Sequence, residues 1–173
     1  MSTVYLVACA APPARDISKF VTEAKVAGWD VCVLTTPSGR AFVDVPALEI
    51  LTGYPVRSEY KRPDDPDELP PPDVIIVAPA TFNTLNKWAL GIADTLAVGL
   101  LAEAIGKRIP LIALPWLNTA LAQHPRFEQT LECLRDWGVQ VLNSPLPEPG
   151  SGPSSAASFP WSAALAALPT RPN

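Results

Sequence analysis

The sequence predicts an α/β protein with a mostly parallel sheet between two layers of helices, a three-layer α/β/α arrangement. Two observations lead to this prediction. The run Val-Ile-Ile-Val-Ala at 74–78 is short and rich in β-branched residues, as in a strand buried on both faces. Residues 4–34 have the pattern of strand, helix and strand, and such a βαβ unit forms a parallel, right-handed crossover.

The boundaries of this first βαβ unit follow from the sequence. Strands are expected at 4–8 and 30–34, and a helix at 14–27 between them, with Gly28 as its end. The helix is predicted by apolar residues at helical spacing, namely Ile17, Phe20, Val21 and Ala24.

The rest of the chain continues the alternation. A short helix at 45–51 precedes a charged, proline-rich segment at 57–72, which is expected to be a long loop before the strand at 74–78. The remaining predicted elements are a helix from 94 to about 105, a strand at 110–114, a helix at 125–137 and a strand at 139–142.

A single main domain is expected. Residues 1–142 contain all the predicted strands. Residues 143–158 are rich in Pro, Gly and Ser, which is typical of a loop, and residues 159–173 are expected to form one terminal helix and a tail.

Composition excludes several classes of function. The 173 residues carry a net charge of −4 and no run of Lys or Arg, so nucleic acid is not expected as a partner. The apolar segment 88–101 is too short and too close to charged residues to span a membrane, and no membrane association is expected. The three cysteines suit buried thiols in a reducing cytoplasm, and their spacing predicts no metal site.

Polar side chains follow three predicted strands at their carboxyl ends, where open α/β sheets bind ligands. Amides and hydroxyls suit a neutral ring and a phosphate better than acid–base catalysis. Backbone N–H groups at a helix start near Ser38 favour an anion, and Arg15 and Arg40 are candidates to add positive charge. The three groups are Thr35, Thr36 and Ser38; Thr81, Asn83 and Thr84; and Asn118 and Thr119.

His124 is the only histidine and the conventional candidate for a base at neutral pH. It stands directly before Pro125, where a helix is predicted to begin. This position favours a surface residue at a helix start over a catalytic base.

Three segments together resemble one known family. The stretch 79–94, Pro-Ala-Thr-Phe-Asn-Thr followed by Lys-Trp-Ala-Leu-Gly-Ile-Ala-Asp, resembles the Pro-x-x-x-Asn-Thr signature of the FMN-containing cysteine decarboxylases. This family includes phosphopantothenoylcysteine decarboxylases and lantibiotic peptidyl-cysteine decarboxylases. Residues 115–118 resemble its Pro-x-Met-Asn-x-x-Met substrate motif, and residues 36–43 its phosphate-side segment. The resemblance spans residues 3–142.

The resemblance implies a Rossmann-like flavoprotein fold with FMN bound between the subunits of a homotrimer. A helix from Trp88 to Asp94 would pack at the subunit interface. Ser38 would face the FMN phosphate, Asn83 would hold the flavin or substrate region, and Asn118 would contact the substrate carboxylate. The implied cofactor-binding residues are Thr36, Ser38, Thr81, Asn83 and Thr84.

The resemblance also implies a reaction. The family oxidises a cysteine thiol through the flavin, and the resulting thioaldehyde acts as an electron sink while CO₂ leaves. The chain is therefore expected to be an FMN-dependent decarboxylase, a lyase, that acts on a peptide or small molecule containing a cysteine.

Departures from the family pattern narrow this expectation. The position of the family's catalytic His falls near Asp65, a carboxylate, which does not replace an imidazole as an acid–base group at neutral pH. The Met positions of the substrate motif are Leu117 and Leu121, and no Cys follows Cys133, where the pantothenate-pathway enzymes carry a reductive Cys. These departures disfavour a housekeeping phosphopantothenoylcysteine decarboxylase.

Two alternatives remain open. The missing His favours a flavin-binding or scaffolding homologue without catalytic activity. A flavin prenyltransferase shares the fold, but its Gly-Ala-Ser-Gly-type first loop is replaced here by residues 8–13, so this alternative is disfavoured.

Overall fold

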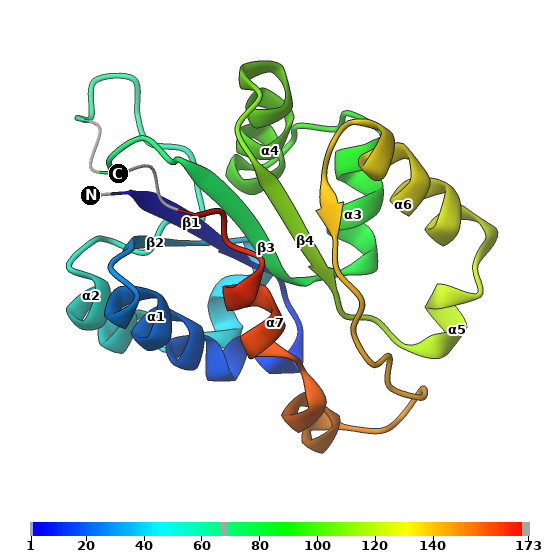
Figure 1. Cartoon of the computed structure of the whole chain (residues 1–173). Helices are drawn as coiled ribbons and strands as arrows, with labels where there is room; N and C mark the ends of the chain where they lie inside the picture. The colour runs from blue at the N-terminus through cyan, green and yellow to red at the C-terminus, as the bar shows by residue number, and fades with distance from the viewer. Residues whose placement is uncertain (1, 67–68, 171–173) are drawn as a thin grey trace.

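The computed structural model describes residues 2–66 and 69–170 (Figure 1). The described strands form one five-stranded, all-parallel sheet in the order β2-β1-β3-β4-β5. The strands are β1 Thr3–Ala8, β2 Asp30–Thr35, β3 Val74–Ala80, β4 Leu111–Pro115 and β5 Gln140–Val141. The strands predicted from the sequence are all present, and β5 is the shortest of them.

Seven α-helices occur in the described chain: α1 Ile17–Val26, α2 Val45–Thr52, α3 Phe82–Ala89, α4 Leu96–Lys107, α5 Thr119–Ala122, α6 Pro125–Asp136 and α7 Trp161–Ala166. Three 3-10 helices accompany them: η1 Pro12–Asp16, η2 Ser38–Phe42 and η3 Pro153–Ser158. Across the described residues, no helix combines the length and apolar character that a membrane span requires.

The helices form a layer on each face of the sheet (Figure 1). Alternate strand side chains point to opposite faces, so Leu6 joins a core with α1, α2 and α7, while Val7 joins a core with α3, α4 and α6. Both cores consist of buried, mostly aliphatic and aromatic side chains. The predicted three-layer α/β/α fold is confirmed.

Residues 143–160, which we call the strap, cross the carboxyl end of the sheet after β5. The Ser144 hydroxyl donates to the carbonyl oxygen of Pro115, and the backbone N–H of Thr119 donates to the carbonyl oxygen of Pro147 at 2.9 Å. The Thr119 hydroxyl also donates to Glu148 Oε2 at 2.8 Å. The strap therefore closes over the polar end of β4, and its last part holds the 3-10 helix η3 in a segment expected to be loop.

Aromatic side chains fix the end of the strap. The rings of Trp116 and Phe159 lie 5.5 Å apart, those of Phe159 and Trp161 lie 4.7 Å apart, and Trp161 reaches Phe20 of α1 at 6.1 Å. Phe159 and Trp161 are both buried. Burial of each ring contributes about 2 kcal/mol, so α7 is part of the folded core.

Two helices differ from the sequence-based expectation. The helix expected from residue 14 begins only at Ile17, because Pro12 and Pro13 lack N–H groups and favour the 3-10 turn η1 before it. The segment 88–94 is not one helix: α3 ends at Ala89, and Gly91 adopts a left-handed conformation with φ of +69° before α4 begins. The four-residue helix α5 has no counterpart in the prediction.

The charged segment 57–66 contacts α4 through Tyr60. Its hydroxyl donates to the carbonyl oxygen of Thr95 at 3.3 Å. The same hydroxyl occupies the space that a Cβ atom on Gly99 would take. Gly99 therefore gives the tyrosine room to lie against the helix.

We expect Gly99→Ala to change the free energy of unfolding little, because a gain in helix propensity of about 1 kcal/mol is offset by displacement of the Tyr60 side chain. In a Tyr60→Ala background the same substitution should stabilise the protein by about 1 kcal/mol. Urea unfolding of the four proteins measures both effects. Equal effects in the two backgrounds would contradict the packing of Tyr60 on Gly99.

Candidate functional site

The strand order places a crevice between β1 and β3. The chain turns to one side of the sheet after β1 and to the other side after β3, and ligands of open α/β sheets bind where the strand order reverses in this way. Ala10 follows β1 and Thr81 follows β3. Two cavities meet here and share Ala10, Thr81 and Asn83.

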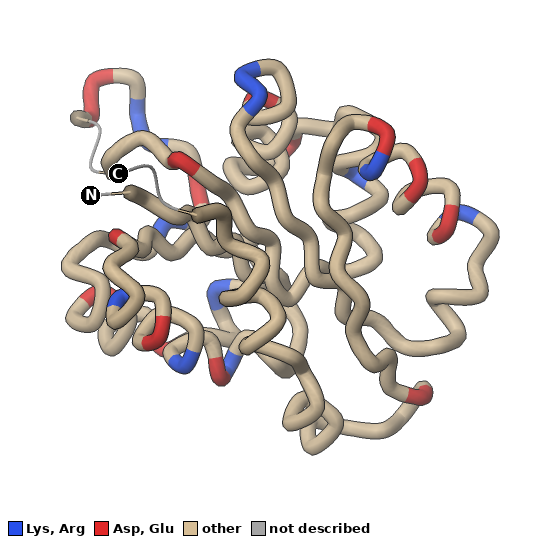
Figure 2. The backbone as a smooth tube through the Cα atoms, viewed as in Figure 1, with Lys and Arg blue, Asp and Glu red and all other residues tan. Residues whose placement is uncertain are grey.

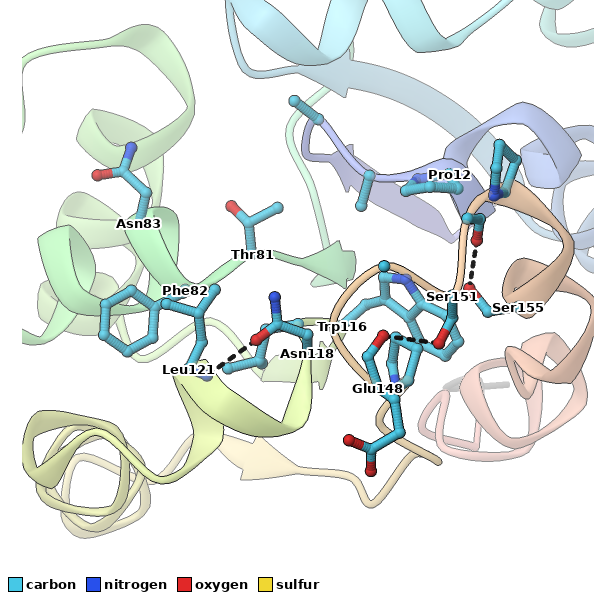
Figure 3. Close-up of a pocket in the computed structure, with 17 residues that line it drawn as sticks. Pro12, Thr81, Phe82, Asn83, Trp116, Asn118, Leu121, Glu148, Ser151 and Ser155 are labelled. Carbon is cyan, nitrogen blue, oxygen red and sulfur yellow. Dashed lines mark hydrogen bonds between the residues drawn. The ribbon is translucent and has the colours of Figure 1, made fainter.

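The first cavity, which we call the Asn118 cavity, has a volume of about 550 Å³. Trp116, Leu117 and Leu121 give it an apolar lining, and strap residues from Pro147 to Ser155 line it too. Figure 3 shows Ser151 and Ser155 of the strap across the cavity from Phe82 and Leu121. Its lining contains one ionisable side chain, Glu148. Figure 3 shows the Glu148 carboxylate pointing away from Thr81 and Asn118, so the interior is close to neutral.

Asn118 is oriented by the helix that it begins. It is the N-cap of α5, and its Oδ1 accepts a hydrogen bond from the backbone N–H of Leu121 at 2.9 Å. Only the oxygen of the amide can accept this bond. The amide NH₂ is consequently turned towards Thr81, into the cavity, where it can donate to a ligand (Figure 3).

The second cavity, which we call the Ser38 cavity, has a volume of about 410 Å³. The structure brings together in its lining all five residues that the sequence predicts for cofactor binding: Thr36, Ser38, Thr81, Asn83 and Thr84. Lys87, Thr95 and Val98 complete the far side. The lining offers hydroxyls, an amide and an ammonium group, and none of its residues is acidic.

The hydroxyls of this cavity differ in how they are engaged. Thr36 Oγ1 accepts from the backbone N–H of Gly39 at 3.0 Å, and Thr81 Oγ1 donates to Thr84 Oγ1 at 3.2 Å. Ser38 and Asn83 are exposed, and their side chains have no hydrogen-bond partner among the described residues. Ser38 and Asn83, together with the hydroxyl of Thr95 and the ammonium of Lys87, are therefore available to bind a ligand.

The loop after β1 contributes little to this site. The backbone N–H of Ala11 donates to the carbonyl oxygen of Cys9 at 2.9 Å, and the two prolines that follow have no N–H. Arg40 Nη1 donates to the carbonyl oxygen of Val56, and neither Arg40 nor Arg15 lines the two cavities. The positive charge that the sequence suggested for these arginines comes instead from Lys87.

Cys9 lies directly behind the polar residues. Burial raises the pKa of its thiol, and hydrogen bonds with Thr84 and Thr81 offset only part of that effect. The thiol is fully buried. Cys9 is thus a neutral core residue at physiological pH and not a nucleophile.

The structure does not bring Asp65 into the site within one chain. Its side chain is exposed, and Oδ2 accepts from the backbone N–H of Arg62 at 3.0 Å in the turn of the charged loop. His124 caps the start of α6, where its Nδ1 accepts from the backbone N–H of Arg126 at 3.1 Å. That position agrees with the prediction of a helix-start residue. The imidazole packs against the ring of Phe82 in an edge-to-face arrangement, with 5.5 Å between the two ring centroids.

Sequence reasoning missed two parts of the site. The first is Lys87, which lies four residues after Asn83 and therefore on the same face of the helix. This spacing is visible in the sequence of the 79–94 stretch and could have identified the lysine. The strap gave no such signal, because its Pro, Gly and Ser residues predict only a loop. Within the part of the chain that the structure describes, no three His, Cys, Asp or Glu side chains gather to hold a metal.

Gly39 is required by close packing beneath the Ser38 cavity. A Cβ atom there would lie 2.5 Å from the carbonyl oxygen of Ala8 and 2.8 Å from Thr36 Oγ1.

We expect Gly39→Ala to destabilise the protein by about 1–3 kcal/mol, measured by urea unfolding. The control Gly106→Ala, whose Cβ would meet open space in α4, should be neutral or stabilising. Equal effects of the two substitutions would contradict the close packing.

Comparison with known proteins bears on the identity of this site. The Flavoprotein family matches residues 15–160. A probable phosphopantothenoylcysteine decarboxylase of Streptococcus mutans is 30% identical over 139 residues, which cover 77% of this chain and 75% of the relative. The bifunctional coenzyme A biosynthesis protein CoaBC of Mycolicibacterium smegmatis is 32% identical over 149 residues, and the match spans 83% of this chain but 33% of that longer protein.

Solved structures of related proteins have the same fold. The epidermin biosynthesis protein EpiD of Staphylococcus aureus superimposes with a TM-score of 0.70 at 27% identity, covering 83% of this chain and 84% of EpiD. An EpiD variant bound to the substrate peptide DSYTC has a TM-score of 0.67 at 25% identity, covering 84% and 83%. The FMN-binding protein AtHal3 shares the fold over 99% of both chains, with a TM-score of 0.72 and 20% identity. The chain belongs to the Flavoprotein family and is related to its cysteine decarboxylases.

Proposed function

We propose that this protein binds FMN across the two cavities and oxidatively decarboxylates a cysteine in a peptide or small molecule. The observation that carries the proposal is the junction at Thr81 and Asn83. One side of the junction opens into a polar cavity and the other into an apolar cavity with the Asn118 amide. A cofactor and a substrate can therefore meet at the reversal point of the sheet.

The residues present fit FMN. Ser38 and Asn83, together with the Lys87 ammonium, suit the polar and anionic parts of the molecule, and the adjoining apolar wall with Trp116 suits a flat ring system. Ser38 also stands at the first residue of η2, where the backbone N–H groups of Gly39 and Arg40 already donate to Thr36, so its hydroxyl is the group offered to the ligand. These features support Thr36, Ser38, Thr81, Asn83 and Thr84 as cofactor-binding residues.

When bound, FMN would accept the two electrons and two hydrogens removed from the C–H and S–H of the cysteine, leaving a thioaldehyde next to the carboxylate. The electrons of the bond to the carboxylate carbon would then move into the thioaldehyde as CO₂ leaves, and the sulfur would take up one proton from water to give an enethiol. In air, dioxygen would be the final acceptor of the two electrons.

The chain's own part in this reaction is binding and desolvation. The Asn118 amide NH₂ donates to the substrate carboxylate and places it against Leu117 and Leu121. An apolar wall solvates a carboxylate poorly, so it favours departure as neutral CO₂. The strap lines the other side of this cavity.

The same lining supports a peptide or a small cysteine derivative as the substrate. Among the described residues, no Lys or Arg lines the Asn118 cavity, and a phosphorylated substrate would find no ion pair with them. A peptide that ends in cysteine carries no phosphate, and its carboxylate and backbone need only amide, hydroxyl and apolar contacts, which Asn118 and the strap provide.

A second candidate function is flavin binding without catalysis. The observation that favours it is the position of Asp65, which is exposed and outside both cavities in a chain without the family His. A flavin-loaded protein that leaves every cysteine substrate unchanged would satisfy this alternative.

We further propose a homotrimer in the cytoplasm. Trp88 is 1% exposed and packs inside its own chain, so it is not free for an interface. Leu90 and Ile92 just beyond it are 57% and 40% exposed and are the better candidates for subunit contacts. The cysteines are all unpaired, as in a reducing compartment.

The first test is cofactor binding. We expect the purified protein to be yellow, or to take up added FMN with the visible spectrum of a bound flavin. Ser38→Ala should raise the dissociation constant for FMN by about 3- to 10-fold, the loss of one hydrogen bond. The control Ser18→Ala, on the exposed side of α1, should leave it unchanged. A protein that remains colourless and binds no FMN would refute the proposal.

The second test is turnover of peptides that end in cysteine, followed by mass spectrometry. We expect loss of CO₂ together with two hydrogens, and no reaction of matched peptides that end in serine. Asn118→Asp keeps the oxygen that caps α5 but replaces the NH₂ donor by a charge, and should lower kcat/KM at least about 10-fold. Asn143→Asp makes the same change outside both cavities and serves as the control. Unaltered peptides throughout would favour flavin binding without catalysis.

A further inference from the structure

Lys87 is the only basic side chain among the residues that line the Ser38 cavity. It lies on α3, one turn after Asn83, and its side chain is 28% exposed. Position and partial burial together keep the ammonium at the cavity wall, where its charge is screened less than on an open surface.

The ammonium is held by one partner outside the cavity. Lys87 Nζ lies 2.6 Å from Asp94 Oδ2, in the turn that joins α3 to α4. Asp94 does not line the cavity. Because an ammonium group has three N–H donors, the bond to Asp94 leaves donors for an anion in the cavity.

The loop after β1 offers few other groups that could bind an anion. In that loop Ala11 bonds internally and the prolines have no N–H, so the backbone offers few donors. The hydroxyl of Ser38 is neutral, and Arg15 and Arg40 lie outside the lining. Lys87 is the group that can pair with a full negative charge.

We propose that Lys87 recognises the phosphate end of the flavin and selects FMN over riboflavin through the N–H donors that the bond to Asp94 leaves free. The proposal rests on the proposed function, in which a flavin occupies the Ser38 cavity. It differs from the expectation based on family resemblance, which gave the phosphate to Ser38 and named no cation.

The test measures dissociation constants for FMN and for riboflavin by quenching of flavin fluorescence. The proteins are wild type, Lys87→Met, Asp94→Asn and the control Lys107→Met, which removes an exposed lysine paired with Glu103 on α4. We expect Lys87→Met to weaken FMN at least about 10-fold, as for a lost charged hydrogen bond, and to leave riboflavin within about 2-fold. Lys107→Met should change neither.

Asp94→Asn separates recognition from a structural role of the ion pair. It removes a negative charge near the phosphate and keeps an amide beside the lysine, so FMN should bind at least as tightly as to wild type. Weakening of FMN equal to that of Lys87→Met would show that the pair only holds α3 to the following turn, and would overturn the proposal.

Salt dependence provides a test that needs no variant. The wild-type preference for FMN over riboflavin should fall as NaCl is raised, because salt screens the lysine–phosphate pair. A preference that is independent of salt, or an unchanged FMN-to-riboflavin ratio in Lys87→Met, would overturn the inference. Failure of the wild type to bind either flavin would instead refute the proposed function.

Discussion

The pairing of β1 with β3 is the constraint on which the site depends. A strand–helix–strand connection in a parallel sheet is right-handed, so the chain leaves β1 towards one face and β3 towards the other. The segments that follow these two strands therefore separate and cannot fill the space between them. A crevice at Ala10 and Thr81 follows from topology before any particular side chain is chosen.

The strap converts this open crevice into a walled cavity. Its polar contacts to Pro115 and Thr119 would give little stability alone, since they lie close to solvent. The burial of Phe159 and Trp161 against Trp116 and Phe20 supplies the stability. Charged residues lie mainly on the outer helices and on the loop between α2 and β3, while the strap carries the single charge of Glu148 (Figure 2). The side of the Asn118 cavity that the strap forms therefore carries little charge, because the strap contains few charged residues.

The sequence predicted the fold well because its signals are local. Buried strands with β-branched residues, helices with regular apolar spacing and polar residues at strand ends all depend on nearby positions. The direction in which the Asn118 amide points was not predictable, since it depends on the cap that the unpredicted helix α5 provides. The closure by the strap depends on contacts with Trp116 and Phe20, which are distant in sequence. Asp65 was placed by counting along a loop, and loop length says nothing about where a side chain lies.

Under the proposed function, the chemistry of the substrate decides how much the absent His matters. A general base contributes about 10²- to 10⁴-fold where the group that it deprotonates is a weak acid. A cysteine thiol ordinarily ionises near pH 8.5, so a few per cent is already thiolate at neutral pH without any base. The loss of CO₂ itself requires an electron sink and a poorly solvated carboxylate, and neither depends on a protein base. Under the proposed function, a site made of amides, hydroxyls and apolar walls can therefore support a decarboxylase that is slower than one with a protein base.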